Sequence, residues 1–261
     1  MRLITMKLYN FEEYDRPNLY DTENENYKED LPFLLKWAER CKGPIIDLAC
    51  GTGRATIPLA IVGHTIIGVD IHKGMLDLAK QKAEVLNLDI DWVQQDCTEL
   101  DLPLKSELIF SVGNSFQHFL TNEQQDALLS SVHRHLATGG YFIFETRFPN
   151  AEELLQPTTE EYWRTYKNQL TGKSVDVYTI SQYDSLNQLQ HYTTIRKEDG
   201  QQDISTRITL RYVFPKEMQR LLNSHGFDIV HIYKDWNERF ITKDSVQMVY
   251  VCRKSEDSSE R

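Results

Sequence analysis

The 261-residue sequence has no long apolar run and little positive charge. No stretch approaches the roughly 18 apolar residues of a membrane-spanning helix, and Met1 to Asn10 lacks the apolar core of a signal peptide. Lys and Arg number 29 against 39 Asp and Glu, a formal net charge of −10. Because a phosphate backbone is bound by clustered Lys and Arg, a nucleic-acid partner is disfavoured and a small molecule is the expected substrate. These absences predict a soluble cytoplasmic protein with no membrane partner.

Cysteine is also scarce, and no two cysteines form a C-x-x-C pair. The four thiols are Cys41, Cys50, Cys97 and Cys252. This spacing favours reduced, buried thiols over disulfides or zinc. His133 and His135 lie two apart on a predicted helix and so face different sides, which argues against a shared metal. We therefore predict no metal site.

The most informative stretch is a glycine turn between a predicted strand and a predicted helix, Asp47-Leu-Ala-Cys-Gly-Thr-Gly-Arg54. Gly51 and Gly53 allow positive φ and close approach of backbone N–H groups to a ligand at the start of a helix. The next apolar run ends in Asp70, where a βαβ unit presents a carboxylate to ribose hydroxyls. Together these features predict a nucleoside-binding site.

A glycine that is missing narrows the ligand. A dinucleotide fingerprint needs a third glycine for close packing over a pyrophosphate, and Thr56 stands there. The acidic Asp47 at a strand end suits a ligand that carries an ammonium and a sulfonium better than one that carries two phosphates. With these residues the chain resembles the class I S-adenosylmethionine-dependent methyltransferases.

The resemblance extends over roughly residues 30 to 150. Asp47 to Gly53 matches the family's first motif, Gly68 to Ile71 its second, and Trp92 to Cys97 its third. It implies S-adenosyl-L-methionine as cofactor and S-adenosyl-L-homocysteine as product. The implied cofactor-binding residues are Asp47, Ala49, Gly51, Gly53, Arg54, Asp70, Ile71, Met75, Asp96, Cys97, Gly113, Asn114 and Tyr20. Many members have glycine where this chain has Ala49, and its methyl group should be tolerated if the residue keeps an extended backbone.

Helix and strand patterns alternate after residue 27. The predicted helices are 27–41, 53–61, 73–86 and 122–137, and the predicted strands are 44–48, 65–70, 89–94, 107–112 and 140–146. This order is typical of a doubly wound α/β fold, and the resemblance implies a Rossmann-like, seven-stranded, mostly parallel sheet. Ligands bind at the carboxyl ends of such strands, where Asp47, Asp70, Asp96 and Asn114 all stand.

Five segments are expected: an N-terminal lid (1–26), a cofactor-binding core (27–150), an inserted antiparallel sheet (151–213), a C-terminal completion of the core sheet (214–254) and a disordered tail (255–261). The insert shows turn signals at Thr171-Gly172, Asp184-Ser185 and Asp199-Gly200. In the family such an insert covers the acceptor or forms a homodimer contact. Tyr20 and Tyr27 are lid candidates, with ordinary packing or solvent exposure as the alternative.

The loop Gly113-Asn-Ser-Phe-Gln-His118 is expected to border the transferring methyl group. It contains no proline, unlike the Asn/Asp-Pro-Pro-Tyr loops that methylate nucleobases or glutamine amides. His118 is the catalytic candidate, because it could act as a base near neutral pH. The alternative is a structural histidine at a helix start, hydrogen-bonded to the backbone. Candidate substrate contacts are Phe116, Arg147, Trp163, Tyr178 and Arg211. Arg207 shares a strand face with Arg211, and both are weak candidates for anion binding.

The sequence therefore predicts methyl transfer to oxygen or nitrogen of a small molecule. A non-catalytic S-adenosylmethionine-binding module that acts through protein association is the alternative. A nicotinamide-dependent oxidoreductase is a third reading, against which Thr56 argues.

Overall fold

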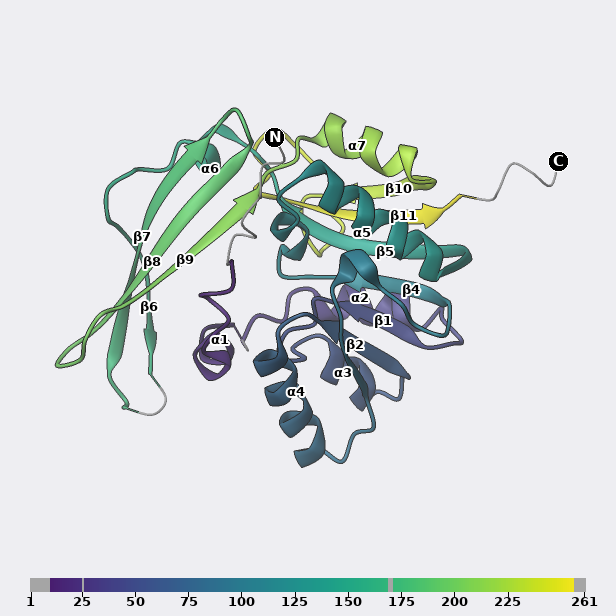
Figure 1. Ribbon diagram of the computed structural model, residues 1–261, viewed down its shortest axis with the longest axis horizontal. Helices are drawn as coiled ribbons and strands as arrows, with labels where there is room; N and C mark the ends of the chain where they lie inside the picture. Colours follow the sequence, from purple (N-terminus) through teal and green to yellow (C-terminus); the bar gives the residue numbers. More distant parts are fainter. Residues whose placement is uncertain (1–9, 25, 169–170, 256–261) are drawn as a thin grey trace, which may run out of the picture.

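The main sheet is mostly parallel and carries helices on both faces (Figure 1). A computed structural model describes residues 10–24, 26–168 and 171–255. The strand order is β10-β11-β5-β4-β1-β2-β3, and β11 runs antiparallel to both neighbours. The bounds are β1 Ile45–Leu48, β2 Ile66–Asp70, β3 Asp91–Gln94, β4 Ser106–Ser111, β5 Leu136–Arg147, β10 Phe227–Tyr233 and β11 Gln247–Lys254. The predicted doubly wound, seven-stranded sheet is confirmed.

Alternating side chains of the apolar strands build one core on each face of this sheet. The helices are α2 Leu31–Ala38, α3 Thr56–Ile61, α4 Lys73–Val85, α5 Asn122–His135 and α7 Pro215–Ser224. Ile46 of β1 packs in one core with Leu129 of α5 and Met218 of α7. Its neighbour Ile45 packs in the other core with Leu34 of α2. Because both faces are covered, the ligand site is left to the ends of the strands.

One boundary difference concerns β5. The prediction placed a Gly-Gly turn before a strand that begins at residue 140, but β5 begins at Leu136 and includes Gly139 and Gly140. Its pairing with β4 shifts register here, and Gly139 has φ of 72°. The glycines therefore form an irregularity within the strand, which positive φ permits.

The predicted insert is an antiparallel sheet of four strands in the order β6-β7-β8-β9. The short helix α6, Ala151–Leu154, leads into it. The strands are β6 Glu161–Lys167, β7 Ser174–Asp184, β8 Leu189–Glu198 and β9 Ile204–Arg211. The predicted turns at Asp184-Ser185 and Asp199-Gly200 connect neighbouring strands.

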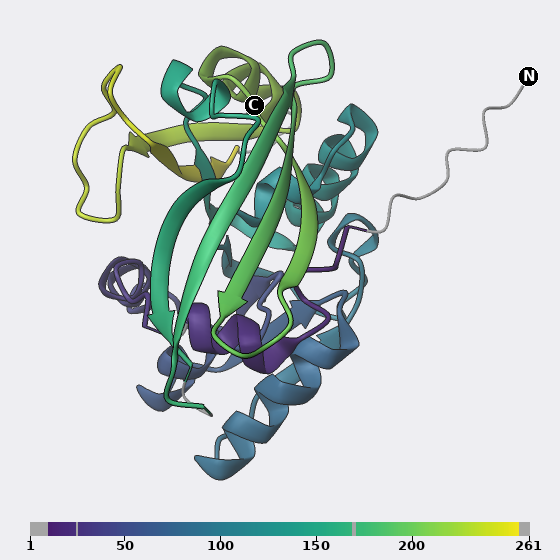
Figure 2. The ribbon, with the colours of Figure 1, turned by 90° about the vertical axis from the view of Figure 1, so that its left-hand side faces the viewer.

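The N-terminal segment 10–24 lies between the inserted sheet and the core (Figures 1 and 2). It contains a helix that sequence analysis did not predict, α1 Pro17–Asn24, in which no apolar residue is fully buried. Asp21 pairs with Lys82 of α4, and Glu23 pairs with Arg196 of β8. Ion pairs to the core and to the inserted sheet, rather than an apolar face, therefore hold α1 in place.

The ends of the chain bear on two expectations. Residues 1–9 of the lid and 256–261 of the predicted disordered tail lie outside the described residues, whereas the Ser255 amide donates to the carbonyl of Gly226. Within the part that the structure describes, no helix is both long and apolar enough to cross a membrane.

Candidate functional site

A cavity of about 1090 Å³, called here the core cavity, opens at the carboxyl ends of the parallel strands. Loops after β1, β2, β3 and β4 contribute to it, together with the N-terminal segment. The predicted site residues that line it are Tyr20, Ala49, Gly51, Asp70, Ile71, Met75, Asp96, Cys97, Gly113, His118 and Arg211. Residues far apart in the sequence thus meet where the fold class predicts a ligand.

Asp70 ends β2 and directs its carboxylate at two loops. Oδ2 accepts from the Gly51 amide at 2.8 Å, and Oδ1 accepts from the His72 amide at 2.8 Å. Burial raises the pKa of Asp70, and these two amides oppose the shift. The N-cap of α4 is His72, whose side chain accepts from Met75. Asp70 is therefore not the helix cap, and each of its oxygens keeps a lone pair for a ligand hydroxyl.

The glycine loop is more strained than expected. Ala49 has φ of 55°, not the extended backbone that the sequence prediction required, so this expectation is corrected. The chain must turn sharply after β1 so that the Cys50 amide can donate to the Val69 carbonyl at 3.0 Å. Gly53, with φ of 78°, does not line the cavity; a Cβ there would lie 2.7 Å from Trp92. Its role in the structure is packing beneath the loop.

Asp47 and Arg54 also lie beneath this loop and do not line the core cavity. Thr56 donates to Asp47 Oδ2 at 2.6 Å, while the buried Oδ1 has no partner. Burial raises the pKa of Asp47 to about 8. Arg54 makes a bidentate pair with the buried Asp30, at 2.8 and 2.6 Å. That pair links Arg54 to the start of α2.

Asp96 follows β3 and caps the short 3₁₀ turn Cys97–Glu99. Its Oδ1 accepts from the amide of Thr98 at 2.9 Å and from the hydroxyl at 2.7 Å. The turn role that sequence analysis considered is thus present, and Asp96 and Cys97 also line the core cavity. The two roles are compatible because a carboxylate has several acceptor positions.

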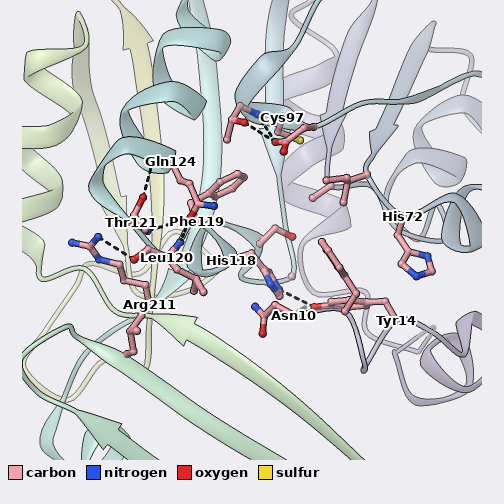
Figure 3. A pocket seen from close by; sticks show the side chains of 18 of the residues that line it. Asn10, Tyr14, His72, Cys97, His118, Phe119, Leu120, Thr121, Gln124 and Arg211 are labelled. Atoms are coloured by element: carbon pink, nitrogen blue, oxygen red, sulfur yellow. Dashed lines mark hydrogen bonds between the residues drawn. The ribbon is translucent and has the colours of Figure 1, made fainter. Parts of the chain in front are cut away.

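A second cavity of about 760 Å³, the insert cavity, lies against the inserted sheet. Tyr14, Tyr20, Gly113 and His118 line both cavities. The Tyr14 hydroxyl and His118 Nε2 are hydrogen-bonded at 2.8 Å (Figure 3). Burial lowers the pKa of His118 to about 4. The two cavities therefore meet at His118, whose imidazole is uncharged at neutral pH. The sequence had suggested a base with a pKa near 7.

Glu145 is a residue that sequence analysis did not assign to the site. This buried side chain at the end of β5 accepts from the Gly113 amide at 2.6 Å and from the Trp236 indole at 3.1 Å. Gly113 and Asn114 both have positive φ, so their amides converge on one carboxylate. Burial raises the pKa of Glu145 to about 7. An acidic residue inside an apolar strand was the available signal.

The five predicted substrate contacts lie in different parts of the molecule. Arg147 and Trp163 line the insert cavity, and Arg211 lines the core cavity. Phe116 is instead in the core, stacked on Phe144 with ring centroids 4.9 Å apart. Tyr178 lines neither cavity, because strand alternation turns Thr179 into the insert cavity and Tyr178 to the opposite face.

Both arginines of β9 pair with carboxylates of the chain itself, the exposed Arg207 with Glu12 at 2.8 Å and Arg211 with Glu217. Arg211 donates to the Leu120 carbonyl and to Asn122, although its buried Nε has no partner. Among the described residues, no group of three His, Cys, Asp or Glu side chains is placed to hold a metal ion.

Residues 45–140 match the family described as a methyltransferase domain, which spans the glycine loop, Asp70, Asp96 and His118. The chain thus carries a methyltransferase domain, and this match confirms the predicted resemblance to the class I S-adenosylmethionine-dependent methyltransferases. A glycine/sarcosine N-methyltransferase of Halorhodospira halochloris is 23% identical over 239 residues, which cover 91% of this chain and 85% of that protein.

Two solved structures share the fold of this methyltransferase. The CcbJ methyltransferase from Streptomyces caelestis has a TM-score of 0.79 at 24% identity and covers 89% of this chain and 96% of its own. CalS10, an amino pentose methyltransferase from Micromonospora echinaspora, has a TM-score of 0.72 at 14% identity, with 91% and 95% covered. The predicted enzyme class is confirmed, and nothing found supports the non-catalytic alternative.

S-adenosylmethionine fits the residues of the core cavity. The lining is acidic at the strand ends, where Asp70 and Asp96 can accept from ribose hydroxyls and an adenine amino group. Asp47 lies beneath the loop and outside this lining, although its buried Oδ1 has no partner. Nothing in this donor and acceptor set favours a pyrophosphate.

Proposed function

We propose that this methyltransferase transfers the methyl group to the nitrogen of a small-molecule amine. The observation that carries the proposal is the meeting of the two cavities at Tyr14 and His118, with the imidazole held neutral. The core cavity takes the cofactor and the insert cavity takes the acceptor. When bound, S-adenosylmethionine supplies a methyl group on a sulfonium sulfur.

Several residues of the core cavity would hold the cofactor. Asp70 accepts from the ribose, Asp96 and the Cys97 amide contact the adenine, and the loop around Gly51 faces the methionine end. Tyr20, on α1, lines both cavities and closes this end of the core cavity. Arg54 is not needed for the methionine carboxylate as long as it remains paired with Asp30.

His118 and Tyr14 would orient the acceptor. A neutral amine attacks with its own lone pair, so the nitrogen needs its N–H groups directed and its lone pair in line with the bond that breaks. Positioning of this kind can supply on the order of 7–11 kcal/mol. The bound cofactor would supply the methyl group, His118 and Tyr14 would hold the amine with its lone pair toward that group, and the proton of the methylated nitrogen would pass to solvent.

The low pKa of His118 favours nitrogen over oxygen. An alcohol must lose its proton as it attacks, and an imidazole with a pKa of about 4 is a weak proton acceptor. An amine that arrives as the free base needs no such acceptor. The names of the glycine/sarcosine N-methyltransferase and of the amino pentose methyltransferase agree with this choice.

The test is turnover with matched amines, alcohols and phenols in the presence of S-adenosylmethionine. Mass spectrometry should show a gain of one methyl group on the amines alone, with one S-adenosylhomocysteine formed per methyl. An Asp70→Ala protein at the same cofactor concentration is the control and should be slower. Methylated alcohols with unchanged amines would contradict the proposal.

A further inference from the structure

Glu153 of α6 holds a cluster of polar side chains on the wall of the insert cavity. Its Oε1 accepts from Arg147 Nη1 at 2.6 Å, from the Tyr192 hydroxyl at 3.1 Å and from the Tyr212 hydroxyl. These donors come from β5, from β8 and from the residue after β9. The carboxylate is thereby fixed in place at the junction of the core with the inserted sheet.

The second oxygen of this carboxylate is available. Oε2 has no hydrogen-bond partner among the described residues, and it is not one of the buried unpartnered atoms. Glu153, Arg147 and Tyr192 all line the insert cavity, which they share with His118. An ordered carboxylate with one saturated and one open oxygen is therefore present on the wall of the proposed acceptor site.

The charge of the cluster indicates what this oxygen would bind. Burial pushes the pKa of Glu153 up, but Arg147 and the Tyr212 hydroxyl outweigh burial and hold that pKa below its usual range. Glu153 is therefore ionised, and the adjacent guanidinium balances its charge. A neutral donor such as a hydroxyl suits a balanced pair better than a second ammonium, which would face Arg147.

We propose that Glu153 Oε2 binds a hydroxyl group of the acceptor, so that the substrate is a hydroxylated amine held at two points, its nitrogen at His118 and its hydroxyl at Glu153. This inference rests on the proposed function, because it places the acceptor in the insert cavity. It makes Glu153 a determinant of specificity rather than a participant in the chemistry.

The experiment compares amino alcohols and amino sugars with their deoxy analogues. Wild type, Glu153→Gln and Glu160→Gln are assayed for kcat and KM, and thermal unfolding checks that each variant folds. Glu160 is the matched control, since it is an exposed glutamate that pairs with Lys197 and lines neither cavity. We expect wild type and Glu160→Gln to prefer the hydroxylated amines by about 10- to 100-fold in KM. Glu153→Gln should lose that preference with little change in kcat.

A Glu153→Gln enzyme that keeps the preference would overturn the inference, as would a wild type that never shows one. The wild-type comparison needs no variant, so a poorly folded Glu153→Gln protein does not block the test. Calorimetric binding of the same compounds with S-adenosylhomocysteine present separates the two proposals. If no amine is methylated but hydroxylated compounds bind wild type and not Glu153→Gln, the proposed function fails and the proposal that Glu153 binds a hydroxyl stands. If no hydroxylated compound binds wild type, the proposal about Glu153 fails too.

Discussion

Asp70 stands between two loops of the cofactor site, and its removal is the most direct test of that site. Asp70→Ala should weaken S-adenosylmethionine binding about ten- to a hundred-fold or more, because a charge-assisted hydrogen bond contributes roughly 1.5–3 kcal/mol. Isothermal calorimetry measures the affinity. Asp77→Ala, on the exposed face of the same α4 helix, is the control. Wild-type affinity in the Asp70 variant would remove Asp70 from the cofactor site.

The state of His118 predicts the pH dependence of the reaction. A pKa of about 4 keeps the imidazole neutral from pH 6 to 9, so the kcat/KM profile should follow the ionisation of the amine alone. His118→Asn, which preserves a neutral hydrogen-bonding group, should keep the shape of the profile and remain faster than His118→Ala. A rate limb between pH 6 and 7 that disappears in the Asn variant would show instead that His118 acts as a titrating base.

Glu145 predicts a pH-dependent stability. Its pKa in the fold, about 7, lies above its ordinary 4.5, so the folded chain holds the proton more tightly than the unfolded chain. Stability therefore falls as pH rises from about 4.5 to about 7, by up to about 3 kcal/mol. Urea unfolding at pH 5 and pH 8 measures the loss, which should be smaller in Glu145→Gln. The pKa of Asp47 is also raised, but this contribution to the pH dependence is the same in wild type and Glu145→Gln and cancels when the two are compared. An identical loss in both proteins would rule out this assignment.

At the scale of elements, α1 is held by buried ion pairs rather than by an apolar face. Glu23 is almost fully buried between Arg196 and Arg164. Glu23→Gln should leave both arginines with weaker partners and loosen α1, since breaking a buried pair is costly. Because Tyr20 of α1 lines the cofactor site, S-adenosylmethionine affinity should fall several-fold and amide hydrogen exchange in 17–24 should quicken.

The exposed pair of Glu12 and Arg207 supplies the control for this experiment. Glu12→Gln should change neither the exchange rates of α1 nor the cofactor affinity by much, since exposed pairs contribute little. Equal effects of the two substitutions would indicate that burial of Glu23 does not matter for closing the site.

At the scale of the whole molecule, the outer edge of the inserted sheet predicts self-association. β6 is an edge strand, and its Tyr162 and Trp163 are exposed. Such an edge tends to pair with another chain, so we expect a homodimer of the 30.6 kDa chain. Light scattering coupled to size exclusion measures the mass, and Trp163→Glu should shift it toward the monomer. A monomeric wild type across a wide concentration range would contradict this expectation.

The sequence by itself determined the parallel sheet, the glycine loop and the positions of Asp70 and Asp96. These follow from local patterns, because apolar runs form strands and the carboxyl ends of parallel strands meet at one edge. An inserted antiparallel sheet of three or four strands was readable for the same reason, since turn residues separate alternating segments.

Only the tertiary structure decided which side chains meet at the site. Tyr14 reaches His118 across 104 residues of sequence, and Arg54 pairs with Asp30 across 24. The alternation of side chains along the strands of the insert was readable, but the face of that sheet that lies against the insert cavity was not. Tyr178 is therefore on the opposite face of the sheet. Glu153, on α6, lines the cavity although no pattern predicted it. Long-range packing sets these contacts and the burial that lowers the pKa of His118, and no local pattern in the chain encodes them.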